Sequence, residues 1–208
     1  MQIQEAYNTW AKNYDEVLNK TRDLEGKVLR EILSKIIFTH CLEIGCGTGK
    51  NTTWFIETGK QITAVDLSAN MLAKAKEKIT DDNVEFVQAD ITNNWNFANK
   101  KYDLVSFSLV LEHIQNLNHI FKEAFKVLNA GGKIYIGELH PFKQYTGSKA
   151  RFETENGTQV IECFTHHISD FINAAKNYQL VLIELNEHFD NENNKEIPRI
   201  LTMVFEKK

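Results

Sequence analysis

Short apolar runs alternate with longer amphipathic segments through most of the chain, and this alternation is the strongest constraint on its fold. The runs are typical of buried strands, and they lie within 40–44, 61–66, 83–90, 102–111 and 133–139. Apolar residues at helical spacing fall between them, at 48–57, 67–79 and 116–129. Strands that alternate with helices of about ten residues or more imply right-handed crossovers and a parallel sheet. We therefore expect an α/β fold with a doubly wound, Rossmann-like sheet.

The two ends of the chain complete this expected fold. Residues 1–37 are predicted to be helical, and Gly131 and Gly132 are expected to stop the helix at 116–129. Toward the C-terminus the expected elements are a hairpin around an Asn-Gly turn in 151–163, a helix at 168–177 and strands at 179–189 and 199–208. The last two strands would pair antiparallel at the sheet edge. The result is a seven-stranded sheet with an antiparallel C-terminal strand and helices on both faces.

Each predicted parallel strand has a chemically useful residue at its carboxyl end. They are Glu43 and Gly45, Asp66, Asp90, Ser108, and Glu138 with His140, in chain order. Open parallel sheets bind ligands outside these ends, near the point where the strand order reverses. We expect these side chains to border one ligand site.

The glycine-rich stretch CLEIGCGTGK (41–50) favours a nucleotide-like ligand, although it fits neither common phosphate motif. A phosphate loop needs a glycine five positions after Gly45, and none is there. A dinucleotide fingerprint needs a third glycine at position 50, which is Lys50, whereas the third glycine comes early, at Gly49. Glu43 would also repel a pyrophosphate, but it would attract an ammonium group.

Two further acids define the rest of this ligand. Asp66 lies 21 residues after Gly45, at the tip of the second strand, where a carboxylate accepts hydrogen bonds from ribose hydroxyls. Asp90, at the tip of the third strand, could accept from the exocyclic amine of adenine. Ammonium, carboxylate, ribose and adenine together describe S-adenosylmethionine.

The sequence resembles the class I S-adenosylmethionine-dependent methyltransferases, in their small-molecule branch. The resemblance is carried by LEIGCGTGKNT, AVDLSANML, VQADI, SFSLVLEHI and VLNAGGKIYIGELHP, and more loosely by the N-terminal WAKNYD. It is specific over about 40 to 141. The fourth-strand segment SFSL is not the motif of amino-methylating DNA enzymes, and the cysteines do not match the nucleophile motif of cytosine-C5 enzymes.

The resemblance implies roles for individual residues around the methyl donor. Glu43 would pair with the methionine ammonium, Asp66 would hold the ribose, and Tyr14 would close over the donor as a lid. The full set implied for cofactor binding is Tyr14, Glu43, Gly45, Cys46, Gly47, Asp66, Leu67, Met71, Asp90, Ile91, Ser108, Leu109 and His113. Several could be structural instead, such as Asp66 as a helix cap or His113 as a packing residue.

The acceptor side is less clearly defined by the sequence. A general base is needed only if the acceptor holds its proton near neutral pH, and the candidates are His140, His166 and Glu138. Equally, His140-Pro141 could be a turn and His166-His167 a helix entry. The expected substrate-binding residues are Tyr7, Tyr145, Phe152 and His167, and their aromatic character suggests a small, partly apolar acceptor. No metal site is expected.

Length and composition favour one domain over 1–208. Its expected parts are an N-terminal helical lid (1–37), a donor-binding core (38–139), an acceptor-side insertion (140–167), and a helix with a β-hairpin (168–208). The net charge of −4 argues against nucleic acid as a partner. Three unpaired cysteines and a polar N-terminus favour a cytoplasmic protein that is neither membrane-bound nor secreted. We expect a monomer or a homodimer.

The sequence therefore predicts methyl transfer from S-adenosylmethionine to oxygen, nitrogen or carbon of a small molecule, by in-line displacement, with S-adenosylhomocysteine as product. Two alternatives stay open, which are methylation of a protein or RNA and a non-catalytic donor-binding module. A nicotinamide dehydrogenase is disfavoured by Glu43 and Lys50.

Overall fold

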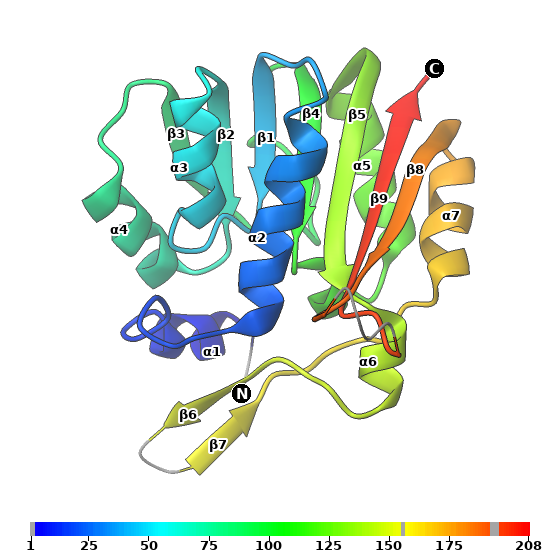
Figure 1. Ribbon diagram of the computed structural model, residues 1–208. Coiled ribbons are helices and arrows are strands. Elements are labelled where there is room, and N and C mark those ends of the chain that lie inside the picture. The colour runs from blue at the N-terminus through cyan, green and yellow to red at the C-terminus, as the bar shows by residue number, and fades with distance from the viewer. Residues whose placement is uncertain (1–2, 155–156, 192–195) are drawn as a thin grey trace.

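The protein folds around one seven-stranded sheet, as a computed structural model that describes residues 3–154, 157–191 and 196–208 shows (Figure 1). The elements that build or cover this sheet are, in chain order, α2 (Lys20–Leu33), β1 (His40–Ile44), α3 (Lys50–Glu57), β2 (Gln61–Asp66), α4 (Ala69–Lys78), β3 (Val84–Gln88), β4 (Tyr102–Ser108), α5 (Leu117–Val127), β5 (Leu128–Leu139), α7 (Ile168–Lys176), β8 (Leu180–His188) and β9 (Ile200–Lys207).

The strand order is β3-β2-β1-β4-β5-β9-β8. Strands β1 to β5 run parallel to one another, and β9 runs antiparallel to both β5 and β8. The predicted α/β class, the doubly wound sheet and the antiparallel C-terminal strand are therefore confirmed. The chain turns to β2 on one side of β1 and to β4 on the other, so the ligand crevice is expected outside the carboxyl ends of β1 and β4.

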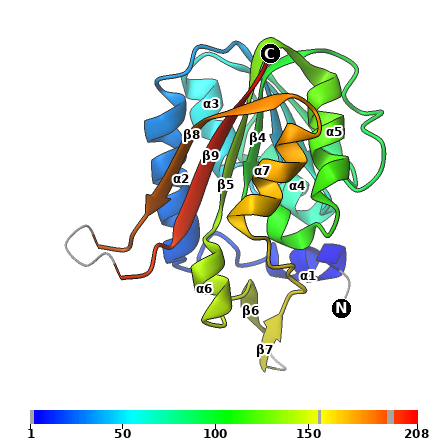
Figure 2. The same cartoon turned by 90° about the vertical axis from the view of Figure 1, so that its right-hand side faces the viewer.

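Helices cover both faces of the sheet, as predicted. Helices α2 and α3 lie on one face, and α5 and α7 lie on the other (Figure 2). A fully buried row from the strands packs under each layer, with Cys41 and Ile62 in the cluster under α2 and α3, and Ile44 and Val105 in the cluster that includes α5 and α7. This alternation of core faces holds the strand ends at fixed positions.

The remaining elements lie at the carboxyl ends of the parallel strands. Helix α1 (Ile3–Trp10), helix α6 (Pro141–Tyr145) and the hairpin of β6 (Arg151–Thr154) and β7 (Gly157–Val160) lie beyond the ends of the parallel strands (Figure 1). A short 3₁₀ helix, η1 (Leu111–His113), follows β4 at the same edge. The hairpin predicted in 151–163 is thus confirmed, and it lies on the ligand side of the sheet.

Two predicted boundaries need correction. Residues 1–37 form two helices rather than one helical segment, because Asn19 caps α2 by accepting from the backbone N–H groups of Thr21 and Arg22. Helix α5 is not stopped by Gly131 and Gly132, since it ends at Val127 and both glycines lie within β5. Helical periodicity alone does not locate such ends.

Among the described residues, no helix is long and apolar enough to cross a membrane.

Candidate active site

The turn after β1 is shaped by backbone conformations that only glycine adopts easily. Gly45 and Gly47 have φ values of +73° and +54°. A Cβ atom on Gly45 would lie 2.0 Å from the Val110 side chain, whereas a Cβ on Gly47 would meet nothing within 4 Å. The turn therefore packs closely against the segment after β4 on one side and leaves open space on the other.

Asp66, at the end of β2, is tied to this turn. Its carboxylate accepts hydrogen bonds from the backbone N–H groups of Gly47 and Ser68, both at 2.8 Å. Burial raises the pKa of Asp66, and these two hydrogen bonds oppose the rise. Each carboxylate oxygen keeps a free lone pair for a ligand hydroxyl. The Ser68 hydroxyl caps α4 by accepting from Met71 N–H, so Asp66 is not needed as the helix cap.

A crevice of about 220 Å³ opens beside Asp66 at the ends of β1, β2 and β4. Most of the residues predicted for donor binding line it, namely Tyr14, Gly45, Gly47, Asp66, Leu67, Met71, Asp90, Ile91, Ser108, Leu109 and His113, together with Tyr7. The walls are mainly apolar, while acids stand at defined points. Such a crevice suits a flat apolar ring joined to a sugar.

A smaller polar cavity continues from this crevice past Gly45 and contains the two other predicted residues, Glu43 and Cys46. It also contains residues that sequence reasoning did not assign to the site, among them Arg22, Glu25 and Asn51. A signal for Glu25 was present in the sequence, because it shares helical spacing with the buried Val28, Leu29 and Ile32. An acid within an apolar helix stripe is rarely buried without a function or a partner.

Both buried acids in this polar cavity hold protons easily. Burial raises the pKa of Glu43 to about 8, against a hydrogen bond from Thr52 Oγ1 at 2.6 Å. Burial also raises the pKa of Glu25 to about 7, although Tyr135, Asn51 and Ser108 donate to it. The nearby Glu25 carboxylate raises the pKa of Glu43 further, because two negative charges at this separation repel each other. A cation bound here would favour the ionised form of both.

The same cavity has an unused hydrogen-bond acceptor. Asn51 Oδ1 is buried and has no hydrogen-bond partner among the described residues, which is uncommon in folded proteins. An ammonium group in the cavity could donate to Asn51 as well as to Glu43. The polar groups of this cavity include two carboxyls, one amide oxygen and the Arg22 guanidinium. They therefore fit an amino-acid tail that carries a positive ammonium and a negative carboxylate.

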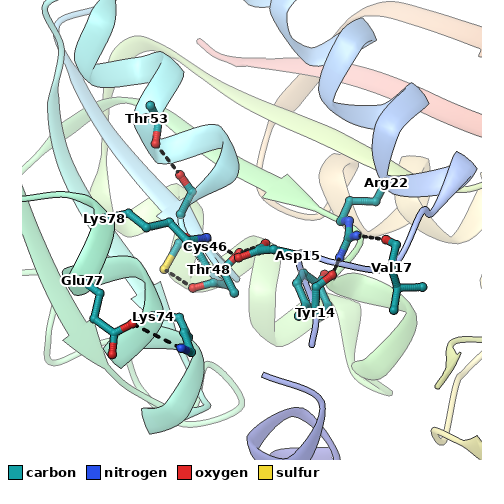
Figure 3. A network of polar contacts seen from close by, with 12 residues as sticks. Tyr14, Asp15, Val17, Arg22, Cys46, Thr48, Thr53, Lys74, Glu77 and Lys78 are labelled. Atoms are coloured by element: carbon teal, nitrogen blue, oxygen red, sulfur yellow. Dashed lines mark hydrogen bonds and ion pairs between the residues drawn. The ribbon is translucent and has the colours of Figure 1, made fainter. Parts of the chain in front are cut away.

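Polar contacts hold the segment between α1 and α2 over the glycine turn (Figure 3). Asp15 accepts from Thr48 Oγ1 at 2.6 Å and pairs with Lys78. Arg22 donates to the backbone carbonyls of Tyr14 and Val17, both at 2.7 Å, and its guanidinium lies 4.2 Å from the centre of the Tyr14 ring. These contacts hold Tyr14 where it lines the crevice.

A second chamber, of about 400 Å³, lies on the other side of this segment. Tyr7, Tyr14 and Leu109 line both the crevice and the second chamber, so these three side chains form the boundary between them. Leu109 has φ of +57°, a conformation that is strained for leucine and that tends to occur at functional sites. The crevice and the second chamber are therefore adjacent cavities that share one boundary.

Tyr7 and His113 form a hydrogen-bonded pair at this boundary. The Tyr7 hydroxyl lies 2.8 Å from His113 Nε2, and His113 Nδ1 lies 2.9 Å from the Glu162 carbonyl oxygen. Because a carbonyl only accepts, Nδ1 of the neutral ring carries the hydrogen, and Nε2 accepts from Tyr7. Burial raises the pKa of Tyr7 well above its usual value, so the phenol stays protonated.

Comparison with known proteins agrees with this geometry. Residues 42–136 match the family model described as a methyltransferase domain. This match covers slightly less than half of the chain, and solved structures that share its fold are S-adenosylmethionine-dependent methyltransferases. These comparisons support S-adenosylmethionine as the cofactor, and the residues of the crevice and the polar cavity fit its ring, ribose and charged tail.

Three relatives illustrate the range of similarity. The chain is 28% identical over 136 residues to a malonyl-[acyl-carrier protein] O-methyltransferase of Priestia megaterium, covering 64% of this chain and 49% of the relative. It is 30% identical over 145 residues to a demethylmenaquinone methyltransferase of Leptospira interrogans, covering 62% and 57%. The chain thus spans about half the length of the curated relatives it matches. The solved N-methyltransferase NodS of Bradyrhizobium japonicum with S-adenosyl-L-homocysteine shares the fold, with a TM-score of 0.72, 16% identity and coverage of 98% and 97%.

The three predicted proton acceptors have other partners, and we correct their assignment. His140 is fully buried, with Nε2 2.9 Å from Glu187 and Nδ1 accepting from Phe142 N–H as the cap of α6. His166 lies 2.7 Å from the Ile114 carbonyl through Nε2. Neither histidine lines the crevice or the second chamber. The turn interpretation of His140-Pro141 therefore fits the structure better than a catalytic one.

Glu138 contacts the backbone next to the boundary residue Leu109 and does not line the cavities themselves. Its Oε1 accepts from the backbone N–H groups of Val110 and Leu111, at 2.9 and 2.8 Å, and burial raises its pKa to about 8. It holds the turn that carries Leu109 and His113, and it lines neither cavity. Glu138 is thus a positioning residue in this geometry.

Of the predicted substrate-binding residues whose side chains the structure describes, only Tyr7 lines the crevice or the second chamber. Tyr145 is exposed, and its hydroxyl lies 2.5 Å from His167 Nδ1 at the start of α7. Both residues lie outside the second chamber, which corrects their assignment to the acceptor site. Phe152 belongs to β6, and its side chain lies outside the described part of the structure.

One cluster of side chains has potential metal-ligand atoms within 4.8 Å of one another, and it consists of Glu112, His113 and Cys163. Both ring nitrogens of His113 already have the partners named above. Hydrogen bonding therefore accounts for the position of His113, and the cluster supports no metal role.

Proposed function

We propose that the protein transfers the methyl group of S-adenosylmethionine to oxygen, nitrogen or carbon of a small molecule held in the second chamber. The observation that carries this proposal is the shared boundary, because Tyr7, Tyr14 and Leu109 face both the donor crevice and a separate chamber. A module that only binds the donor would not need a second chamber against the reacting end of the crevice.

Each part of the donor has a partner among the residues described above. Asp66 would accept hydrogen bonds from the ribose hydroxyls, and Glu43 with Asn51 would accept from the ammonium group. Leu67, Met71 and Ile91 would pack on the adenine, with Asp90 at its edge. Arg22 would balance the carboxylate of the tail. The bound donor supplies a methyl group on a positively charged sulfur, which is already activated for in-line displacement.

The protein's own contribution is position and, for a protonated acceptor, a route for the proton. The apolar boundary excludes water and fixes the approach of the acceptor. As an acceptor O–H or N–H group loses its proton to the Tyr7 oxygen, the Tyr7 hydrogen passes to His113 Nε2. Tyr7 thus stays neutral throughout and His113 becomes cationic, with the Glu112 carboxylate 3.9 Å from Nε2. Tyr7 and His113 replace His140 as the groups we assign to proton transfer.

Two measurements test the proposal. Isothermal titration with S-adenosylhomocysteine should show one site, and that site should be lost in Asp66→Ala. A methyl-release assay over a panel of metabolites, proteins and RNA should give turnover with a small molecule. Donor binding without turnover on any class would support the non-catalytic alternative, and turnover only on protein or RNA would replace the proposed acceptor class.

A further inference from the structure

The second chamber carries an unusual charge for a protein whose net charge is −4. Four cationic side chains line it, which are Arg22, Lys149, Arg151 and Arg199. Glu112 is the one acid among the described residues that line it. The chamber is therefore a positive region in an acidic protein.

Not all of these charges are available to a ligand. Arg199 is largely neutralised, because its guanidinium donates to both carboxylate oxygens of Asp190. Arg22 is held by two backbone carbonyls and also lines the donor's polar cavity. Lys149 and Arg151 differ from both, since neither makes an ion pair within the described residues.

The positions of these two cations suit a ligand that spans the chamber. Arg151 is the first residue of β6 and Lys149 lies just before that strand, whereas Tyr7 and Leu109 stand at the boundary with the donor crevice. Trp10 and Tyr14 add aromatic side chains to the walls of the chamber. An acceptor with its reacting atom at Tyr7 could thus place an anionic group against the hairpin.

Resting on the proposed function, we propose that the acceptor is a small molecule that carries a carboxylate or phosphate group, which Lys149 and Arg151 bind. The anionic group orients the acceptor, and the aromatic walls cover its apolar part. Salt screens the attraction between these exposed cations and an anionic group, so binding of the acceptor should weaken as ionic strength rises.

The test uses the full chain saturated with S-adenosylhomocysteine and two matched probe pairs, benzoate with benzyl alcohol and phenyl phosphate with phenol. Isothermal titration should show that the anionic member of at least one pair binds about tenfold or more tightly than its neutral partner. The double variant Lys149→Ala/Arg151→Ala should remove this preference and leave affinity for S-adenosylhomocysteine unchanged.

The matched control is Lys76→Ala/Lys122→Ala, which removes two exposed lysines that line neither cavity. This control should keep the anion preference. Three results would overturn the proposal. They are equal affinity for the anionic and neutral members of both pairs, no binding of either anion at millimolar concentration, and an equal loss of the anion preference in the control variant. None of these results bears on donor binding, so failure of the proposed function would be seen separately, as loss of S-adenosylhomocysteine binding or of turnover.

Discussion

At the scale of single residues, the buried acids beside the glycine turn make donor binding sensitive to pH. Glu43 has a pKa of about 8 in the donor-free protein, so it is mostly protonated at neutral pH. An ammonium group favours the carboxylate, and binding must therefore release a proton.

Below the pKa of Glu43, we expect affinity for S-adenosylhomocysteine to rise by about tenfold per pH unit for each proton that Glu43 and Glu25 release on binding. Titration calorimetry in two buffers of different ionisation enthalpy measures the released proton. Glu43→Gln should weaken binding and reduce the proton release, whereas the exposed Glu77→Gln should change neither. A pH-independent affinity in the unmodified protein would contradict the assigned position of the ammonium group.

Also at this scale, Tyr7→Phe should separate proton transfer from binding. The variant keeps the ring at the boundary and loses the hydroxyl that contacts His113. With an acceptor that must lose a proton, kcat should fall by about 10²-fold or more, while affinity for S-adenosylhomocysteine stays the same.

Tyr145→Phe is the matched control, since the Tyr145 hydroxyl also contacts a histidine but at the surface. Its kcat should equal that of the unmodified protein. If both variants behave alike, the pair of Tyr7 and His113 has no role in proton transfer.

At the scale of elements, the contact between the glycine turn and the segment after β4 joins two parts of the crevice. Gly45→Ala would add strain at a φ of +73° and also place a methyl group 2.0 Å from Val110. Gly59→Ala would add similar strain at a φ of +74°, but the new methyl would meet nothing within 4 Å.

We expect Gly59→Ala to lower the free energy of unfolding by about 1–2 kcal/mol, from backbone strain alone. Gly45→Ala should cost about 1–3 kcal/mol more, from overpacking against Val110, and should also weaken donor binding. Urea unfolding and titration calorimetry measure the two effects. Equal stability of the two variants would mean that the turn and the segment after β4 are not tightly packed.

At the scale of the whole molecule, three buried carboxyls make stability depend on pH. The pKa values of Glu25, Glu43 and Glu138 are raised to about 7, 8 and 8 from an ordinary 4.5. The folded protein therefore keeps protons that the unfolded chain has lost, and its stability falls as pH rises from about 4.5 to about 8.

Several surface acids have the opposite effect, such as Asp15, Asp23 and Asp190, whose pKa values are lowered by Lys78, Lys50 and Arg199 respectively. Their stabilisation is lost as pH falls below about 4. Urea unfolding across this range should thus show a maximum on the acid side of neutrality for the donor-free protein. S-adenosylhomocysteine should stabilise the protein more at about pH 8 than at about pH 6, and a pH-independent increment would contradict the charge assignment.

The fold and the donor side were largely predictable from sequence because both depend on local order along the chain. Short apolar runs and helical spacing indicated the strands and most of the helices, and each strand end carried its candidate residue with it. Glu43, Gly47 and Asp66 needed no long-range information, since parallel strands bring their carboxyl ends to one edge. The break between α1 and α2 was missed because an Asn cap is a single side-chain contact within a helical pattern.

What the sequence determined by itself is the α/β sheet and the donor-binding edge, because periodicity and strand-end chemistry follow from neighbouring residues. What only the tertiary structure decided is the acceptor side. His140 and Tyr145 have the right chemistry but lie outside the chamber, whereas Tyr7, Arg22 and Lys149 reach it from distant segments. The physical reason is that the chamber is formed by the packing of the N-terminal segment, the turn after β4 and the hairpin, and no short pattern encodes contacts over such separations.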